Sequence, residues 1–249
     1  MNFVEYGQDK NQIIILLHGG GLSVWNYREI ADILKDDYHV IIPILDGHAD
    51  SYHDFTTIKD NALRIIDYID THCHGHVLAM GGLSLGGQIL LDILSYRSDI
   101  CKIAFIESAL VLPSRLMHDM IRPSLQLSYG LIYYRWFSKL QFDTYQLKYD
   151  LFEDYYRDTC KITKENMILF MEENSMYSLK STLKDTLAKV YIFVGEKENI
   201  IMRKSAKMIH SYIEGSYLTI LPHMNHGQFS ICHAKKYVNQ MKKAIYENI

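Results

Sequence analysis

The amino-acid sequence predicts an α/β domain in which a mostly parallel β-sheet carries helices on both faces. Short runs of apolar, largely β-branched residues recur along the chain, and such runs are typical of strands buried on both faces of a parallel sheet. Segments with apolar residues at helical spacing separate these runs, as in right-handed strand–helix–strand crossovers. The alternation stops once, over residues 108–188, where no strand-like run occurs. These observations predict one sheet with a long insertion between two of its strands.

The predicted strands and helices follow one another in regular order. Strands are expected near residues 2–6, 13–17, 38–42, 76–80, 102–106, 190–194 and 217–221. Helices are expected over residues 27–34, 57–72, 88–94, 202–212 and 230–247. Thr56 or Thr57 is expected to cap the second helix, because a threonine side chain accepts a hydrogen bond from first-turn amides. Pro43 is expected to end the third strand, because proline cannot donate to a sheet ladder.

The insertion divides the chain into two predicted domains. Residues 1–107 and 189–249 are expected to form the core domain, and residues 108–188 a helical cap, or lid. The middle of the cap, residues 129–156, is dense in aromatic side chains. Most of these should hold the cap onto the sheet, and a few are expected to line an apolar pocket.

Composition restricts the class of protein. With 249 residues, 48% hydrophobic and 22% charged, the chain has enough apolar material for a sizeable core. A net charge of −3 gives no reason to expect a nucleic acid or a membrane surface as partner. The four cysteines are widely spaced, which is typical of reduced thiols in a cytoplasmic protein. No signal peptide and no membrane-spanning run is evident, so we expect a cytoplasmic protein without stable membrane association. Nothing in the sequence indicates an oligomeric state.

The stretch Gly82-x-Ser84-x-Gly86 lies between a predicted buried strand and a predicted helix. This is the pattern of a nucleophile elbow, in which a serine occupies a sharp strand-to-helix turn. The two glycines leave room for the strained backbone of such a turn. The serine hydroxyl would stand at a helix N-terminus, whose amides favour developing negative charge. The alternative is a glycine-rich turn that holds a phosphate or only packs tightly.

Residues able to assist a serine nucleophile follow other predicted strands. A histidine and three glycines, residues 18–21, follow the first buried strand, Glu198 follows the sixth predicted strand and His226 follows the seventh. Because ligands gather at the carboxyl ends of parallel strands, we expect these residues to meet Ser84 at one edge of the sheet. A serine requires a base, usually histidine, that a carboxylate holds in one tautomer.

In these residues the sequence resembles the α/β-hydrolase superfamily, over nearly its whole length. Five motifs in chain order carry the resemblance: His18-Gly19, Gly47-His48, Gly82-x-Ser84-x-Gly86, Gly195-x-x-Glu198 and Asn225-His226. The resemblance implies the α/β-hydrolase fold. The family usually begins with more antiparallel strand than residues 1–12 supply, so we expect a sheet of about seven strands with the family's first strand missing.

The resemblance also implies a chemistry. Ser84 would be the nucleophile and His226 the general base, and the backbone N–H groups of Gly20 and Leu85 would form the oxyanion hole, with Gly21 as an alternative donor. The expected function is that of a carboxylesterase, which cleaves a small to medium apolar ester through an acyl-enzyme. No cofactor and no metal are expected. A serine at the elbow argues against dehalogenase and epoxide-hydrolase chemistry, for which relatives use aspartate.

Three assignments stay open at this point. Most relatives carry aspartate as the acid where this chain has Glu198, and Glu107 is the alternative acid because it follows the strand after the elbow. His223 competes with His226 as the base. The histidine-rich stretch 72–76 resembles a metal site, but it spans a helix end and a strand start, so its side chains should diverge.

Two other functions fit the same residues. A C–C bond hydrolase or an acyltransferase would use the same three catalytic side chains. A non-enzymatic small-molecule receptor would keep them on a hydrolase scaffold without turnover.

Overall fold

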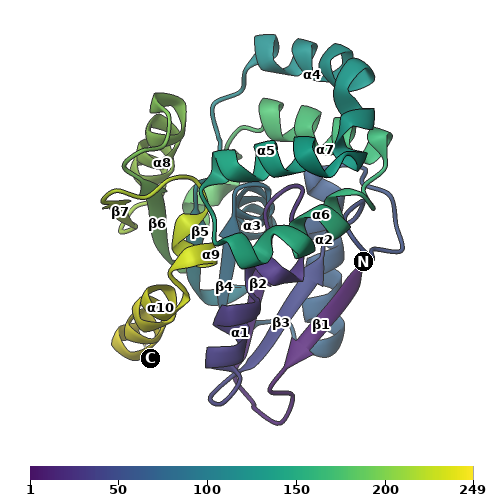
Figure 1. Ribbon diagram of the computed structural model, residues 1–249. Helices are drawn as coiled ribbons and strands as arrows, with labels where there is room; N and C mark the ends of the chain where they lie inside the picture. Colours follow the sequence, from purple (N-terminus) through teal and green to yellow (C-terminus); the bar gives the residue numbers. More distant parts are fainter. Residues whose placement is uncertain (249) are drawn as a thin grey trace.

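The computed structural model describes residues 1–248, and a seven-stranded sheet forms its centre (Figure 1). The strands are β1 (Asn2–Tyr6), β2 (Ile13–Leu17), β3 (His39–Ile44), β4 (Val77–Leu83), β5 (Cys101–Glu107), β6 (Lys189–Gly195) and β7 (Tyr217–Leu221). Their order across the sheet is β1-β3-β2-β4-β5-β6-β7. The edge strand β1 pairs antiparallel with β3, and every other pair is parallel. The predicted fold class is confirmed.

Helices cover both faces of this sheet. Those that join the strands are α1 (Arg28–Leu34), α2 (Ile58–His72), α3 (Leu85–Tyr96), α8 (Ile200–Tyr212), α9 (Gln228–Cys232) and α10 (Ala234–Asn248), with the short turn η1 (Val24–Asn26) before α1. Buried side chains of α2, α3 and α8 belong to one hydrophobic cluster, and those of α1, α9 and α10 belong to a second. The two clusters therefore lie on opposite faces of the sheet. Thr57 caps α2 through a hydrogen bond from the Asp60 amide, one of the two caps expected from sequence.

The segment between β5 and β6 contains helices and connecting loops but no strand. It contains α4 (Arg115–Ser128), η2 (Tyr129–Tyr133), α5 (Arg135–Tyr145), η3 (Tyr149–Leu151), α6 (Phe152–Thr159), α7 (Lys164–Met176) and η4 (Ser181–Asp185). The helices α4 to α7 lie above the end of the sheet at which α3 begins (Figure 1). The last turn, η4, packs on α3 instead. The insertion therefore covers the edge of the sheet at which the elbow serine lies.

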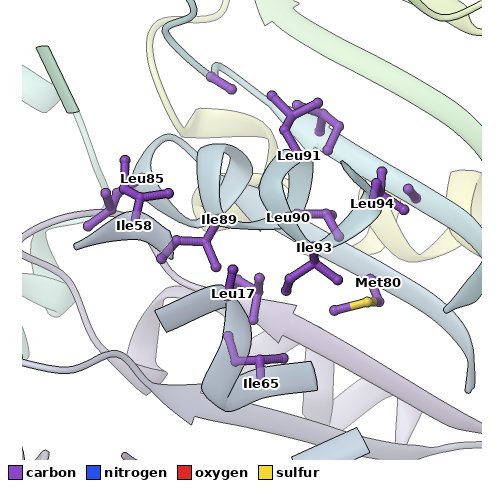
Figure 2. Packing of buried hydrophobic residues seen from close by; sticks show 14 of the residues in the cluster. Leu17, Ile58, Ile65, Met80, Leu85, Ile89, Leu90, Leu91, Ile93 and Leu94 are labelled. Carbon is purple, nitrogen blue, oxygen red and sulfur yellow. The ribbon is translucent and has the colours of Figure 1, made fainter. Parts of the chain in front are cut away.

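The helix α3 is buried on every side. Residues Leu85 to Ser95 are all buried, and most of them are apolar. The polar ones, Gln88, Asp92 and Ser95, each make a hydrogen bond. Its side chains pack against Ile58 and Ile65 of α2 and against Leu17 and Met80 of the sheet (Figure 2). Dense packing of this kind fixes the start of the helix, and with it the position of the elbow.

Two of the differences from the predicted boundaries, at Pro43 and at His233, have a clear physical reason. Pro43 does not end a strand, because β3 continues to Ile44 and Pro43 pairs with Phe3 of the edge strand. The parallel register with β2 ends at Ile41, so the missing proline N–H removes no ladder bond on that side. The expected helix 230–247 is two helices, since His233 leaves helical geometry (φ −125°, ψ 44°) between α9 and α10.

None of the helices within residues 1–248 combines the length and the apolar character needed to cross a bilayer.

Candidate active site

Ser84 occupies a strained turn between β4 and α3. Its backbone has φ 53° and ψ −112°, an uncommon conformation for any residue but glycine. Its N–H donates to the Glu107 carbonyl at 2.8 Å. A Cβ atom on Gly82 would overlap the Gly86 carbonyl, and one on Gly86 would overlap the Leu17 carbonyl. Both flanking positions therefore require glycine, and the turn that they permit presents the serine at the start of α3.

Two backbone amides lie beside this serine without protein acceptors. Leu85 is the first residue of α3, and Gly20 belongs to the loop after β2. Within residues 1–248 neither N–H donates to a protein atom. A Cβ placed on Gly20 would lie 3.5 Å from the Leu85 Cβ, so the two residues are direct neighbours. Gly21 lines the same cavity, with φ 75°. The site thus has free N–H donors where an oxyanion hole would require them.

His18 braces the glycine loop. Its Nδ1 donates to the Gly19 carbonyl at 2.9 Å, and its Nε2 accepts from the Leu45 N–H at 3.1 Å. One nitrogen donates and the other accepts, so the ring is neutral. Burial lowers the pKa of His18 to about 3, in agreement with a neutral ring. Asn26 adds a second brace by accepting the Gly19 N–H at 3.1 Å.

His226 and Glu198 form a hydrogen-bonded pair. Nδ1 of His226 lies 2.8 Å from Oε2 of Glu198. The other carboxylate oxygen, Oε1, accepts from the Ser108 hydroxyl at 2.6 Å and from the Gly195 N–H at 2.7 Å. Burial acts to raise the pKa of Glu198, but these hydrogen bonds and the His226 ring outweigh it and hold the pKa below its ordinary value. Glu198 is therefore a buried, ionised carboxylate on one nitrogen of His226.

Glu107 has a different set of partners. Its carboxylate accepts the N–H groups of Phe229 at 3.1 Å and Ser230 at 3.2 Å, in the first turn of α9. In the described part of the chain it makes no hydrogen bond to the His226 ring. Burial raises the pKa of Glu107 to about 7. This side chain anchors the helix that follows His226.

Ser108 is a residue that the sequence analysis missed. It directly follows β5, adopts φ 53° and is buried. Its position after a strand at the same edge as Ser84 was the available signal, but nothing local indicated a contact with a residue 90 positions away. Its hydroxyl donates to Oε1 of Glu198, the carboxylate oxygen that does not contact His226.

Neither His223, the alternative base, nor the histidines of residues 72–76 take part in the contact with Glu198. His223 has an 86% exposed side chain and faces Glu196, at 3.6 Å from Nδ1 to the carboxylate. Around residues 72–76, His72 stacks on Tyr68. Residues 1–248 contain no group of three or more His, Cys, Asp or Glu side chains arranged to hold a metal.

Two cavities meet at Ser84. The first, of about 330 Å³, is lined by Gly20, Leu85 and residues of α4 to α7. The second, of about 380 Å³, is lined by Glu198, His226 and the loops after β6 and β7. Ser84 lines both. No hydrogen bond joins Ser84 to His226 within the described residues, and such bonds often tighten only when substrate binds.

The chain belongs to the alpha/beta hydrolase family, whose model matches residues 14–230. Over 107 residues it is 29% identical to a thermostable monoacylglycerol lipase from Bacillus sp. (strain H-257), a match that covers 41% of this chain and 42% of that protein. The matched part thus spans less than half of the curated relative's length. The predicted membership of the α/β-hydrolase superfamily is confirmed.

Solved structures of esterases share the fold. An esterase from Exiguobacterium antarcticum superposes with a TM-score of 0.82 at 16% identity, covering 98% of this chain and 94% of that one. A thermophilic esterase from Thermogutta terrifontis superposes with a TM-score of 0.79 at 15% identity, covering 98% and 93%. At these identities the likeness concerns the fold.

Proposed function

We propose that the protein is a carboxylesterase that cleaves an ester through an acyl-enzyme on Ser84, with His226 as general base and Glu198 as the orienting carboxylate. The observation that carries the proposal is the 2.8 Å contact from His226 Nδ1 to Glu198 Oε2, beside a cavity that Ser84 and His226 both line. A carboxylate on Nδ1 favours the tautomer in which Nε2 is unprotonated, and Nε2 is the atom that must accept the serine proton.

In the first half of the reaction, Oγ of Ser84 attacks the carbonyl carbon of the ester while Nε2 of His226 takes the hydroxyl proton. The carbonyl oxygen becomes an oxyanion, which accepts hydrogen bonds from the N–H groups of Leu85 and of Gly20, with Gly21 as the alternative donor. Glu198 remains ionised and stabilises the imidazolium. The bond to the alkoxy oxygen then breaks, and His226 gives its proton to the departing alcohol.

In the second half, water attacks the acyl carbon and gives a proton to His226. The bond to Oγ breaks, Ser84 takes the proton back, and the carboxylic acid leaves. The esterases and the monoacylglycerol lipase among the similar proteins support an ester as substrate.

The helical insertion has its own place in this proposal. Residues 108–188 would act as a cap domain on a core of residues 1–107 and 189–249. Cavity-lining side chains from α4, α5, α6 and α7 support this division. The cysteines of the described chain are all free, which supports a reducing compartment such as the cytoplasm.

The test is covalent labelling followed by turnover. The purified protein is treated with a fluorophosphonate probe, the labelled peptide is identified by mass spectrometry, and hydrolysis of p-nitrophenyl esters is measured. We expect label on Ser84 and none in Ser84→Ala, which should also lose turnover. Ser211→Ala, which changes an exposed serine of α8, is the matched control and should keep both.

Two outcomes would count against the proposal. A folded protein that takes no label on Ser84 would overturn it. Label on Ser84 without turnover of any ester would favour a C–C hydrolase, an acyltransferase or a receptor that keeps the same three residues.

A further inference from the structure

We infer that the wall of the first cavity formed by α5 and α6 binds a second, neutral oxygen of the substrate, a hydroxyl or a carbonyl that is not part of the ester group. The side chains that bind it are Tyr155 and Thr159 of α6, with Gln141 of α5. The inference rests on the proposed function, because it takes this cavity as the substrate site. It deepens that function by naming a chemical group of the substrate.

On the side of α4, η2 and α7, the polar side chains that line this cavity form hydrogen bonds within the protein. The Tyr129 hydroxyl donates to the Ile162 carbonyl at 2.7 Å. The Ser128 hydroxyl donates at 2.8 Å to the carbonyl one turn earlier in α4. The Asn174 amide of α7 donates to Gln88 at 2.8 Å. Contacts inside the protein thus hold the polar side chains on this side of the cavity.

The wall formed by α5 and α6 has the opposite character. Its polar side chains are Gln141 and Tyr145 of α5 and Tyr155 and Thr159 of α6, and within residues 1–248 none of the four makes a hydrogen bond of normal geometry. The two helices pack against each other (Figure 1). Each pair is one helical turn apart, and the rings of Tyr145 and Tyr155 lie 6.2 Å apart between centroids. The four unpartnered side chains therefore form one polar patch on a single wall.

Thr159 is the most buried member of this patch, with a 4% exposed side chain. A threonine in a helix can satisfy its hydroxyl by donating to the carbonyl four residues earlier, as Thr71 does to Asp67 at 2.7 Å. The Thr159 hydroxyl makes no such bond, and it has no partner among the described residues. A buried hydroxyl without a partner lowers stability. An oxygen of a bound substrate would supply the missing partner.

Tyr155 brings a second hydroxyl to the same place. Its side chain is 5% exposed, and its ring packs on Phe142 with the centroids 5.3 Å apart. Burial raises the pKa of Tyr155 and the Thr159 hydroxyl opposes that rise, so the two hydroxyls are neighbours. No hydrogen bond of normal geometry joins them within residues 1–248. Because each hydroxyl can both donate and accept, the pair can hold one substrate oxygen between them.

The chemistry of the cavity requires that this oxygen be neutral. Among the described residues that line the first cavity, none carries a charged side chain. A carboxylate or a phosphate would lose its hydration there without gaining a counter-ion. A hydroxyl or a carbonyl loses less, and Tyr155, Thr159 and Gln141 can all donate to it. Apolar side chains such as Ile121 and Phe170 would surround the rest of the substrate.

Pairs of esters that differ in one terminal group test the inference on the native protein. The p-nitrophenyl esters of ω-hydroxyhexanoate, ω-hydroxyoctanoate and ω-hydroxydecanoate are compared with those of heptanoate, nonanoate and undecanoate, in which a methyl group replaces the hydroxyl. Hexanediol monoacetate and heptyl acetate repeat the comparison in the alcohol. An ester of an oxo acid, with its carbonyl next to the last methyl group, shows whether a carbonyl serves as well.

At the length that brings the added oxygen to the wall of α5 and α6, we expect kcat/KM of the oxygen-bearing ester to exceed that of its methyl-ended partner about threefold or more. A wall without such a site would desolvate the oxygen without a partner, and the methyl-ended ester would then be faster at every length. That result in every pair, in acid and alcohol alike, would overturn the inference.

Two variants that change only a hydroxyl locate the effect. Thr159→Val and Tyr155→Phe should each lower kcat/KM of the favoured oxygen-bearing ester about tenfold and leave its methyl-ended partner within about twofold. Tyr129→Phe is the matched control, because Tyr129 lines the same cavity but donates its hydroxyl to a protein carbonyl. It should change both esters of a pair by the same factor. Equal effects of Thr159→Val and Tyr155→Phe on both esters would overturn the inference.

Stability distinguishes a hydroxyl that binds substrate from one that holds the fold. Since the Thr159 hydroxyl has no partner among the described residues, the urea midpoint of Thr159→Val should equal or exceed that of the native protein. A lower midpoint, with the same loss of activity on both esters of a pair, would show a structural hydroxyl and contradict the inference.

The inference and the proposed function fail in different ways. Calorimetric titration of Ser84→Ala with both esters of the favoured pair measures binding without the proposed nucleophile. Tighter binding of the oxygen-bearing ester, lost when Thr159→Val is added, supports the inference whatever reaction the protein catalyses. Turnover and Ser84 labelling without any gain from the added oxygen, in kcat/KM or in binding, would leave the function standing and overturn the inference alone.

Discussion

Nδ1 of His226 and Oε2 of Glu198 lie 2.8 Å apart, although 28 positions separate them in the chain. Their loops follow β7 and β6, which are neighbours in the sheet, so the parallel register brings the two side chains together. Gly195 ends β6, and a Cβ atom there would overlap the Met224 carbonyl. The contact between His226 and Glu198 thus depends on the close approach of the two loops.

Replacing each candidate acid by glutamine should separate their roles. Glu198→Gln leaves an amide on Nδ1, which can favour the wrong tautomer, and removal of the orienting charge should lower kcat about 10³- to 10⁴-fold by the serine-protease precedent. Glu107→Gln keeps an acceptor for α9 and should cost about 1 kcal/mol, or about fivefold. Steady-state kinetics on one ester checks both. A larger loss for Glu107→Gln than for Glu198→Gln would contradict the assignment.

Removing the Ser108 hydroxyl should weaken catalysis without abolishing it. A hydrogen bond to a charged group contributes about 1.5 kcal/mol or more, so Ser108→Ala should lower kcat/KM about tenfold. Ser108 has φ 53°, where alanine is strained and glycine is not. Ser108→Gly is therefore the control for backbone strain. If Ser108→Gly restores full activity, the hydroxyl is not what positions Glu198.

Titration of the Glu107 carboxyl should lower the free energy of unfolding as pH rises. Its pKa is about 7 in the folded protein, above the ordinary carboxyl value of 4.5, so the folded state holds a proton that the unfolded state has released. The free energy of unfolding should therefore decrease between about pH 4.5 and pH 7, by about 3 kcal/mol at most.

Urea denaturation at pH 5 and pH 8 measures this effect, and Glu107→Gln should remove most of the difference. Glu198 and His226 are the titratable groups that interact with the Glu107 carboxyl. Since the pKa of Glu198 is lowered, its own contribution is lost only as pH falls below about 4.5, outside this window. An equal slope in the native protein and in Glu107→Gln would show that Glu107 is not the source.

Alanine at Gly86 should disrupt the elbow. Its Cβ atom would overlap the main-chain carbonyls of Leu17 and His18, which cannot move without breaking the sheet. We expect a loss of about 3 kcal/mol or more in the free energy of unfolding. At Gly130 a Cβ would meet no atom within 4 Å, so Gly130→Ala should change stability by less than about 1 kcal/mol. Equal stability of the two variants would contradict the packing argument.

The order of the fold was predictable because its signals are local. Apolar runs such as Ile13–Leu17 are buried as strands, and the edge strand β1 was expected from a single short run. The prediction that Pro43 ends a strand was wrong because the hydrogen-bond ladder between β2 and β3 already ends at Ile41. A proline beyond that point removes no hydrogen bond on that side, and the sequence does not show where the ladder ends. The break at His233 carries no glycine or proline signal, and α9 is anchored separately by Glu107.

Parts of the candidate site depend on tertiary contacts that no local pattern encodes. Because side chains at the carboxyl ends of parallel strands meet at one edge of the sheet, the sequence predicted that Ser84, Glu198 and His226 lie there. The same reasoning left both Glu198 and Glu107 as possible acids. The contacts of Glu107 with α9 and of Ser108 with Glu198 follow from how the chain packs after β5. The two cavities depend in the same way on the packing of the inserted helices.

The most direct measurement of the central proposal is the mass of the Ser84 peptide during turnover. Protein mixed with p-nitrophenyl octanoate is quenched in acid within the first turnovers, digested and analysed by mass spectrometry. The account predicts an octanoyl group on Ser84, formed with a burst of p-nitrophenol that matches the enzyme concentration, and no such adduct in Ser84→Ala. Ester hydrolysis that proceeds without an acyl group on Ser84, or that persists in Ser84→Ala, would contradict it.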